Sequence, residues 1–148
     1  MKYCTVELEM GVIVDTNVIV AFLIEKEKNH NKALTLFRSL LENSHGSLFV
    51  TDYIIDEVIT LIGSRFKRKD LVEQAYSFMS EDSGIFNFIK TESHHLTKAW
   101  EYWKKYTEYP KRPLSFTDAS ILVVSEEYSI EYVASFDTEF DGLISVLK

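Results

Sequence analysis

The sequence predicts a single α/β domain with a central parallel sheet of four to five short strands flanked by helices. Short apolar runs alternate along the chain with stretches of helical periodicity, which is the pattern of βαβ units. The first run, residues 12–14, is apolar at every position, as strands of a sheet covered on both faces are. The chain has 148 residues, of which 46% are hydrophobic, enough for one sizeable core but short for two. We therefore expect one domain over residues 1–148.

The first expected strand, residues 12–14, stops at Asp15. Thr16 and Asn17 follow it and are good candidates to cap a helix. The second apolar run, over residues 18–23, predicts that helix, which is short because a charged stretch comes next. A carboxylate therefore stands at the junction between the first strand and the first helix.

An amphipathic helix comes next, capped by Asn29 or Asn31, and its apolar residues recur at intervals of three and four. These residues are Ala33, Leu34, Phe37, Leu40 and Leu41. The sequence Asn-Ser-His-Gly at residues 43–46 predicts the end of this helix. The second strand is expected over residues 48–50, and a helix over residues 53–66 follows it.

The second half of the chain repeats this alternation of strands and helices. The expected elements are a helix over 70–80, a strand over 85–89, a helix over 91–106, a helix over 115–128, a strand over 132–136 and a last short strand over 144–147. Pro110 and Pro113 bracket the loop before the last helix. The strands and helices together predict βαβ units and a mostly parallel sheet.

Charge and cysteine content exclude several classes of protein. The formal net charge of −7 argues against a generally basic surface that coats nucleic acid, although an enzyme with a local cluster of acids stays open. The one cysteine, Cys4, excludes an intramolecular disulfide framework and a multi-cysteine zinc site. No apolar run is long enough to span a bilayer, and residues 1–10 lack the plan of a signal peptide. We expect a cytoplasmic protein without a membrane partner.

Asp15 and Glu57 are the first two candidate site residues. Asp15 ends the first strand, at the edge where open α/β sheets bind ligands, although a turn residue is also common there. Glu57 lies on the apolar stripe of its helix, because it follows Ile54 by three residues and precedes Leu61 by four, whereas Asp56 points away. A buried carboxylate is costly unless it is paired, protonated or bound to a cation. The alternative is a Glu at the edge of the stripe that reaches water.

Asp118 and Asp137 are the other two candidates. Asp118 opens an apolar helix, and the four residues from Ser115 to Asp118 (SFTD) also match a capping box, so a capping role stays open. Asp137 ends an expected strand, as Asp15 does, and Asp141 is the alternative fourth acid. Either of these two acids could also be a turn former.

The four acids occupy equivalent places in the predicted fold. Each falls at the C-terminal end of a strand or in the first two turns of the following helix, and these positions converge on one crevice. Clustered carboxylates repel one another unless cations bind or their pKa values rise. Oxygen ligands suit Mg²⁺ or Mn²⁺, and such a site predicts metal-assisted hydrolysis of phosphodiesters. Side chains that could orient the carboxylates or metal-bound water are Thr16, Asn17, Ser115 and Thr117.

The order of these motifs resembles that of PIN-domain proteins, most of all the VapC-type toxin ribonucleases of prokaryotic toxin–antitoxin pairs. The motifs are DTN at residues 15–17, the buried Glu57, Asp118 and Ala119 at the start of an apolar helix, and SFDTEFD at residues 135–141. The resemblance implies Mg²⁺ or Mn²⁺ and endonucleolytic cleavage of RNA. By position, the acidic quartet it implies is Asp15, Glu57, Asp118 and Asp137, with Asn17 and Thr117 in support. It also implies a homodimer and an antitoxin peptide over the active site.

Two other functions stay open from the sequence. A non-catalytic PIN-like module that binds RNA or protein would be marked by a lost acid, and none of the four is missing. A phosphatase of the haloacid dehalogenase type also begins with a strand-end Asp. Its motif resembles D-x-D-x-[TV], however, and Asn17 stands at the second Asp position.

Three further features are more typical of structural roles. The basic residues at 65–69, 104–105 and 111–112 favour solvated helix ends and loops over contacts with RNA phosphates. Trp100 and Trp103 share one helix face, which favours core or dimer packing over base stacking. His94 and His95 are adjacent on a helix, so their rings are expected to point apart as surface polar groups.

Overall fold

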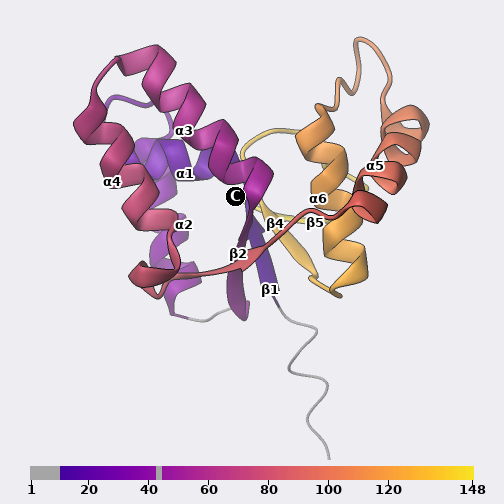
Figure 1. The fold of residues 1–148 in the computed structure, drawn as a ribbon, viewed down its shortest axis with the longest axis horizontal. Coiled ribbons are helices and arrows are strands. Elements are labelled where there is room, and N and C mark those ends of the chain that lie inside the picture. Colours follow the sequence, from indigo (N-terminus) through magenta and orange to yellow (C-terminus); the bar gives the residue numbers. More distant parts are fainter. Residues whose placement is uncertain (1–10, 43–44) are drawn as a thin grey trace, which may run out of the picture.

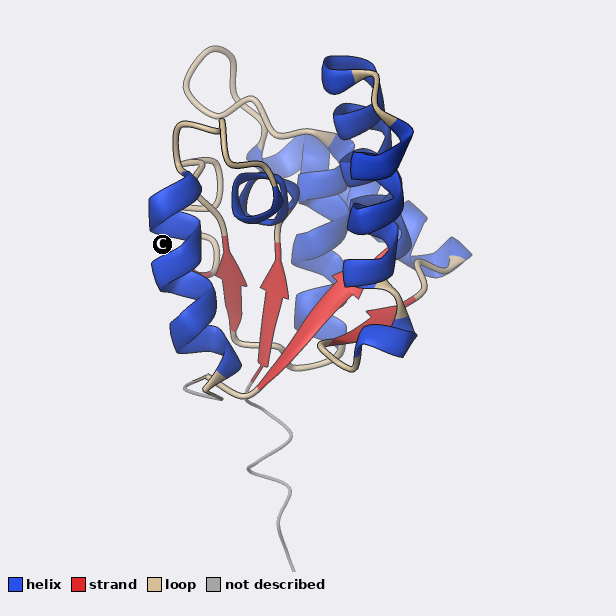
Figure 2. Ribbon diagram, turned by 90° about the vertical axis from the view of Figure 1, so that its left-hand side faces the viewer, coloured by secondary structure: helices blue, strands red, loops and turns tan. Residues whose placement is uncertain are grey.

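The computed structural model describes residues 11–42 and 45–148. These residues contain one five-stranded sheet in the order β3-β2-β1-β4-β5, and every neighbouring pair of strands is parallel (Figure 1; Figure 2). The strands are β1 (Gly11–Val14), β2 (Ser47–Thr51), β3 (Phe86–Ile89), β4 (Tyr132–Ala134) and β5 (Ser145–Leu147). The predicted parallel sheet of four to five short strands is confirmed. The expectations for residues 1–10, including Cys4, and for residues 43–44 lie outside the described residues.

The sheet changes direction at β1. The chain runs outward from β1 to β2 and β3 on one side, and it later fills the other side with β4 and β5. Val12 of β1 pairs with Leu48 of β2, and Ile13 of β1 pairs with Val133 of β4. All four residues of β1 are buried, as the central strand of a covered sheet should be. Ligand sites in such sheets lie outside the carboxyl ends of the strands at this switch point, which here follows Val14.

The helices form two groups on either side of the strands (Figure 1). The first group is α1 (Thr16–Leu23), α2 (His30–Leu41), α3 (Asp52–Phe66) and α4 (Lys69–Met79), followed by the short 3₁₀ helix η2 (Glu81–Ser83). The second group is α5 (Ser93–Tyr106) and α6 (Phe116–Glu127). Each predicted helix is present with its ends displaced by at most a few residues. Within the described part of the chain, no helix is both long and apolar enough to cross a membrane.

A cluster of phenylalanines fills the space between the first helix group and the sheet. The ring centroids of Phe22 and Phe37 are 4.4 Å apart, and Phe78 lies 5.2 Å from Phe22 and 5.3 Å from Phe86. Such tilted and edge-on contacts add to the free energy gained by burying the rings. The cluster joins the C-terminal part of α1 to α2, α4 and the start of β3, so it holds α1 against the rest of the first helix group and the sheet.

Helix α2 buries a narrower face than its sequence pattern predicts. Ala33, Phe37 and Leu40 are buried, whereas Leu34 and Leu41 are 38% and 50% exposed. The two exposed residues were expected on the apolar face. Each instead follows a buried residue directly, so the turn of about 100° per residue carries it toward the rim of the helix.

Helix α6 is buried along most of its length. Residues 119–125 are all buried, as expected of a helix that is apolar nearly all round. The helix packs against α5, and the Ser115 side chain caps its N-terminus. Because the body of α6 is enclosed, its first turn has a defined position near the carboxyl ends of the strands.

The fourth strand is shorter than predicted, since β4 ends at Ala134 rather than at residue 136. The residues after Ala134 are bound by Asp15, the N-cap of α1, and by Asn17 of α1. Ser135 Oγ donates a hydrogen bond to Asp15 Oδ2 (2.9 Å), and Asn17 Oδ1 accepts one from the Phe136 backbone N–H (3.0 Å). The turn after β4 is therefore tied to the strand end that carries Asp15.

Candidate active site

Asp15 is the most deeply buried of the four predicted acids. It is the N-cap of α1, it is 3% exposed, and its side chain accepts hydrogen bonds from the Thr16 backbone N–H (2.8 Å) and Ser135 Oγ (2.9 Å). Burial raises the pKa of Asp15 to about 8; the negative charges of Asp118 and Glu57 add to the shift, and the two hydrogen bonds oppose it. The N-cap of α1 is therefore a buried carboxylate close to two other acids.

Glu57 reaches the same place from α3. The Thr16 side-chain hydroxyl donates a hydrogen bond to Glu57 Oε1 (2.5 Å), which links α3 to the first residue of α1. Glu57 is half-buried, and its neighbour Asp56 is exposed, as the helical spacing predicts. The carboxylate therefore stands at the rim of the apolar stripe and faces Asp15.

Asp118 both caps its helix and faces the other acids. Its Oδ2 accepts a hydrogen bond from the Ser115 backbone N–H (2.9 Å), and Ser115 Oγ accepts one from the Asp118 backbone N–H (3.0 Å), which completes a capping box. Burial raises the pKa of Asp118 to about 6; the hydrogen bonds to Ser115 oppose the shift, and Glu139 and Glu57 add to it.

Asp137 and Asp141 lie in different surroundings. Asp137 is exposed and lines the same cleft as Asp15, and its backbone N–H donates to Ser135 Oγ (3.2 Å). Asp141 does not line this cleft, and its backbone carbonyl accepts a hydrogen bond from the Arg112 guanidinium (2.6 Å). The geometry thus brings Asp137, and not Asp141, to the other acids.

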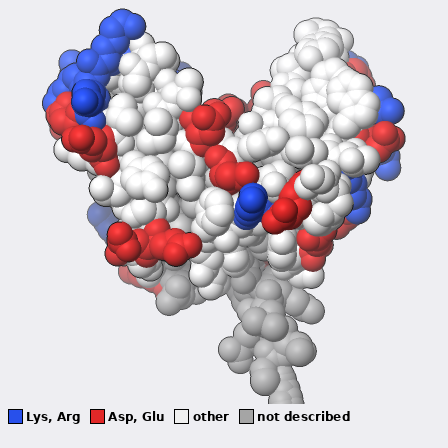
Figure 3. All heavy atoms as spheres, viewed as in Figure 1, with Lys and Arg blue, Asp and Glu red and all other residues white. Residues whose placement is uncertain are grey.

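The acids line one cleft of about 350 Å³ at the carboxyl ends of β1 and β4. Its lining residues are Asp15, Thr16, Asn17, Val20, Glu27, Glu57, Leu61, Arg65, Pro113, Ser115, Asp118, Asp137 and Glu139. Figure 3 shows acidic side chains at the base of a notch between two lobes of the molecule. Three of the four predicted supporting residues, Thr16, Asn17 and Ser115, line the cleft, and Thr117 lines a groove beside it.

Glu139 belongs to this cluster, although the sequence pattern did not single it out. Its Oε2 atom is buried and has no hydrogen-bond partner among the described residues. A buried carboxylate oxygen without a partner is costly, and a cation would satisfy it. The available signal was the spacing of acids in SFDTEFD, where Glu139 lies between the two acids that were weighed.

The donor set of the cleft fits a hard divalent cation. Carboxylate and hydroxyl oxygens surround the cleft, and neither His nor Cys is among its lining residues. Oxygen ligands of this kind suit Mg²⁺ or Mn²⁺ rather than Zn²⁺. The raised pKa of Asp15 also fits a cation site, because a bound cation can replace the proton that this carboxyl group retains in the metal-free protein.

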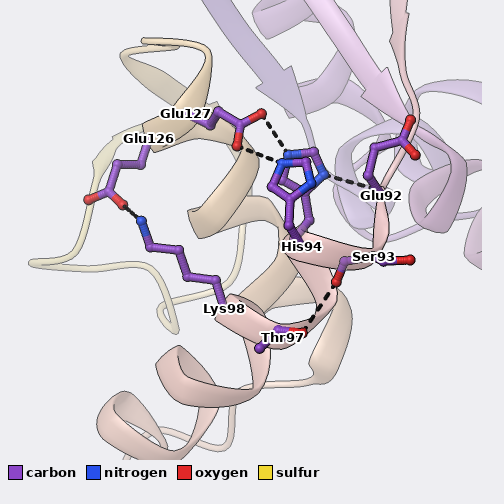
Figure 4. Close-up of polar contacts among 8 residues, drawn as sticks. Glu92, Ser93, His94, Thr97, Lys98, Glu126 and Glu127 are labelled. Atoms are coloured by element: carbon purple, nitrogen blue, oxygen red, sulfur yellow. Dashed lines mark hydrogen bonds and ion pairs between the residues drawn. The ribbon is translucent and has the colours of Figure 1, made fainter.

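The expectation for His94 and His95 was wrong for the orientation of the rings and for the exposure of His95, whereas His94 is exposed as expected. Their ring centroids are 4.0 Å apart, and both Nε2 atoms lie 2.9 Å from the two carboxylate oxygens of Glu127 (Figure 4). His95 is fully buried, and its Nδ1 accepts a hydrogen bond from the Glu92 backbone N–H (2.9 Å). That bond puts the proton of the neutral ring on Nε2, facing Glu127. The group therefore joins α5 to α6, and the tautomer opposes metal binding at the His95 Nε2.

Of the other two secondary features, Trp100 differs from expectation and the basic residues do not. Trp100 is 49% exposed and stacks on Trp103 at 5.3 Å, so core packing is wrong for Trp100. Among the basic residues, Arg65 pairs with Glu27 (2.8 Å) at the rim of the cleft, and Arg68 pairs with Asp70. Nearby carboxylates thus already neutralise two cations of the 65–69 cluster.

Comparison with known proteins places this architecture in a family. The PIN domain model matches residues 12–143. A VapC ribonuclease of Archaeoglobus fulgidus is 30% identical over 131 residues, which cover 88% of this chain and 80% of that protein.

Two solved structures have a similar fold. VapC20 of Mycobacterium tuberculosis, described as a sarcin–ricin loop cleaving toxin, superposes with a TM-score of 0.72 at 21% identity, over 87% of this chain and 92% of that one. A toxin–antitoxin complex from Klebsiella pneumoniae gives a TM-score of 0.63 at 17% identity, over 93% and 96%. At these identities the likeness is one of fold. The sequence matches carry the assignment further, and the chain belongs to the PIN domain family.

Proposed function

We propose that this protein is a divalent-metal-dependent endoribonuclease and the toxin of a toxin–antitoxin pair. The observation that carries the proposal is the carboxylate cluster around the buried Asp15, which is costly to assemble without a cation. Membership of the PIN domain family and the 30% identity to a VapC ribonuclease support the choice of RNA as substrate.

In this proposal Asp15, Glu57, Asp118 and Asp137 hold Mg²⁺ or Mn²⁺. The bound ion lowers the pKa of its water and neutralises charge that develops on the phosphate. Thr16 orients Glu57 and Ser135 orients Asp15 through the hydrogen bonds described above, and Asn17 Nδ2 donates a further hydrogen bond to Asp15 Oδ2 (3.4 Å).

Ser115 has the corresponding role for Asp118. Because the capping box occupies Oδ2 of that carboxylate, the other oxygen can face the ion. Thr117, the remaining predicted supporting residue, borders the neighbouring groove.

The partners and location follow from the same proposal. An antitoxin protein would cover the cleft, two copies of the chain would form a homodimer, and the pair would act in the cytoplasm. Similarity to a chain from a toxin–antitoxin complex supports the antitoxin partner. Size-exclusion chromatography with light scattering tests the dimer directly.

Cleavage of a pool of structured RNAs tests the enzyme. We expect cutting with Mg²⁺ or Mn²⁺, no cutting with EDTA, and a loss of at least about a hundredfold in Asp15→Asn. Asp137→Asn and Asp141→Asn form a matched pair, because only Asp137 lines the cleft. We expect the first of these to lose activity and the second to retain it.

The outcomes separate the alternatives. Metal binding without cleavage of any RNA would favour a non-catalytic PIN-like binding module. Cleavage that persists in EDTA would overturn metal dependence. Equal loss in Asp137→Asn and Asp141→Asn would leave the fourth acid of the quartet unassigned.

A further inference from the structure

A second depression adjoins the acid cleft between α3 and the start of α6, and we call it the aromatic groove. Its volume is about 570 Å³, and its lining residues are Tyr53, Asp56, Glu57, Thr60, Leu61, Ser64, Phe116 and Thr117. Glu57 and Leu61 also line the acid cleft, so the two depressions share a wall. Figure 1 shows α3 and α6 on opposite sides of the notch that Figure 3 shows in space-filling form. A chain held in the acid cleft would therefore have this groove beside it.

Two aromatic rings stand at this groove. The centroids of Tyr53 and Phe116 are 6.4 Å apart with an interplanar angle of 46°, so the rings are tilted and do not cover each other's faces. Phe116 is 37% exposed although it is the first residue of a buried helix. An aromatic face left open beside a nucleic-acid site can stack on a base, and such stacking tolerates any base because each has a π-face.

The charges of the groove favour the base over the backbone of a nucleotide. Asp56 and Glu57 are its charged lining residues, and neither Lys nor Arg is among them. Carboxylates repel a phosphate but accept hydrogen bonds from the amino and ring N–H groups of a base. The hydroxyls of Thr60 and Thr117 can bond to either kind of group on a base edge.

We infer that the aromatic groove binds one unpaired nucleobase of the RNA strand, next to the phosphodiester held at the acids, with Phe116 as the stacking surface. The inference rests on the proposed ribonuclease function and adds a base-binding subsite to it. It also explains why the exposed ring lies at this end of α6, immediately beside Ser115 and close to Asp118.

Binding to short RNA tests this inference without requiring cleavage. The probes are fluorescein-labelled unpaired RNA octamers, one intact and a set with a single abasic nucleotide at each position, measured by anisotropy with Mg²⁺. All proteins carry Asp15→Asn so that the RNA stays intact. We expect one abasic position to weaken binding about tenfold.

Phe116→Ala should weaken binding of the intact octamer about tenfold. In this variant the abasic position should no longer weaken binding, because the missing base would have stacked on the missing ring. Phe116→Tyr should restore both. Phe88→Ala is the matched control, because Phe88 is 44% exposed on β3 and does not line the groove. Its affinities should stay within about twofold of the background.

Each other result overturns the inference in a recognisable way. Unchanged RNA affinity in Phe116→Ala would overturn the base-binding groove. It would not affect the cleavage assay, which uses the protein without the Asp15→Asn substitution. Unchanged RNA affinity together with a loss of self-association in sedimentation would assign the groove to a second copy of the chain. Absence of RNA binding in every protein would overturn the inference, and the cleavage assay of the unsubstituted protein would decide separately whether it is a nuclease. The expected pattern without any cleavage by the unsubstituted protein would retain the groove and overturn the nuclease.

Discussion

Asp15 shows how burial and hydrogen bonding compete at one carboxylate. Thr16 and Ser135 donate hydrogen bonds to it, which would lower its pKa, yet loss of water and two neighbouring charges raise the pKa to about 8. Desolvation therefore outweighs the hydrogen bonds. Without a metal the protein carries a proton at this position near neutral pH, and the fold is less stable when that proton leaves.

Asp15→Asn should stabilise the metal-free protein at alkaline pH. Because the pKa in the folded state lies above its ordinary value of 3.8, the folded state binds more protons between these values, and the free energy of unfolding falls as pH rises from about 4 to 8. The variant lacks this slope. In urea unfolding with EDTA, we expect it to be more stable at pH 8 by about 1–3 kcal/mol and nearly equal to the original at pH 4.

The control for this measurement is Asp70→Asn. The hydrogen bond from Arg68 lowers the pKa of the exposed Asp70, so removing this carboxylate should not stabilise the protein at pH 8. If Asp15→Asn also shows no gain at pH 8, the carboxylate is not held in an unfavourable environment.

Glu139→Gln should lower the pKa of Asp118. The negative charge of Glu139 contributes to raising that pKa to about 6, and the neutral amide removes the contribution. Carbon-13 NMR of the Asp118 side-chain carboxyl, titrated without metal, measures the change. Glu131→Gln removes an exposed carboxylate and is the matched control. An unchanged Asp118 titration in Glu139→Gln would place Glu139 too far away to act on it.

At the scale of elements, one buried histidine lies at the junction of α5 and α6. His95 is fully buried, accepts a hydrogen bond from the Glu92 backbone N–H at the start of α5, and bonds to Glu127 at the end of α6. His94 reaches the same carboxylate from the surface, with its side chain 64% exposed. The two adjacent histidines therefore contact the same carboxylate, one from the interior and one from the surface.

The two histidines should differ in their contribution to stability. His95→Leu leaves the Glu92 N–H without its acceptor and should lower the free energy of unfolding by about 2–3 kcal/mol. His94→Leu should change it by no more than about 0.5 kcal/mol, because its contact is exposed to solvent. Urea unfolding at pH 7 measures both. Equal losses would contradict the role of burial.

At the scale of the whole molecule, the acid cleft joins segments far apart in the chain. Asp15 follows β1, Glu57 lies in α3, Asp118 begins α6 and Asp137 follows β4. Repulsion among these carboxylates opposes the packing of the elements that carry them. An ion bound at the cleft would therefore stabilise the entire fold and not one loop.

Mg²⁺ or Mn²⁺ should raise the thermal unfolding temperature. At an ion concentration a hundred times the dissociation constant, the free energy of unfolding should rise by about 2.7 kcal/mol. The rise should be larger at pH 8 than at pH 6, because at pH 6 the ion must displace the proton of Asp15, whose pKa is about 8. Differential scanning calorimetry measures it. Asp118→Asn should reduce the rise and Asp141→Asn should retain it; equal rises in both would place the ion elsewhere.

The order of strands and helices, the parallel sheet, and the positions of Asp15, Glu57 and Asp118 at its carboxyl edge could all be predicted from the sequence. These features follow from local periodicity, capping residues and the general geometry of βαβ units. The two positions of Asp118, in a capping box and at the start of an apolar helix, are likewise both visible in sequence.

Which of the later acids line the cleft, and which contacts the two histidines make, could not be predicted from the sequence and became visible in the folded chain. The turn after Ala134 follows hydrogen bonds to Asp15 and Asn17, which lie about 120 residues earlier, and this turn brings Asp137 and Glu139 inward while Asp141 stays outside. The burial of His95 likewise depends on contact between α5 and α6. Such contacts join distant parts of the chain, and no local pattern encodes them.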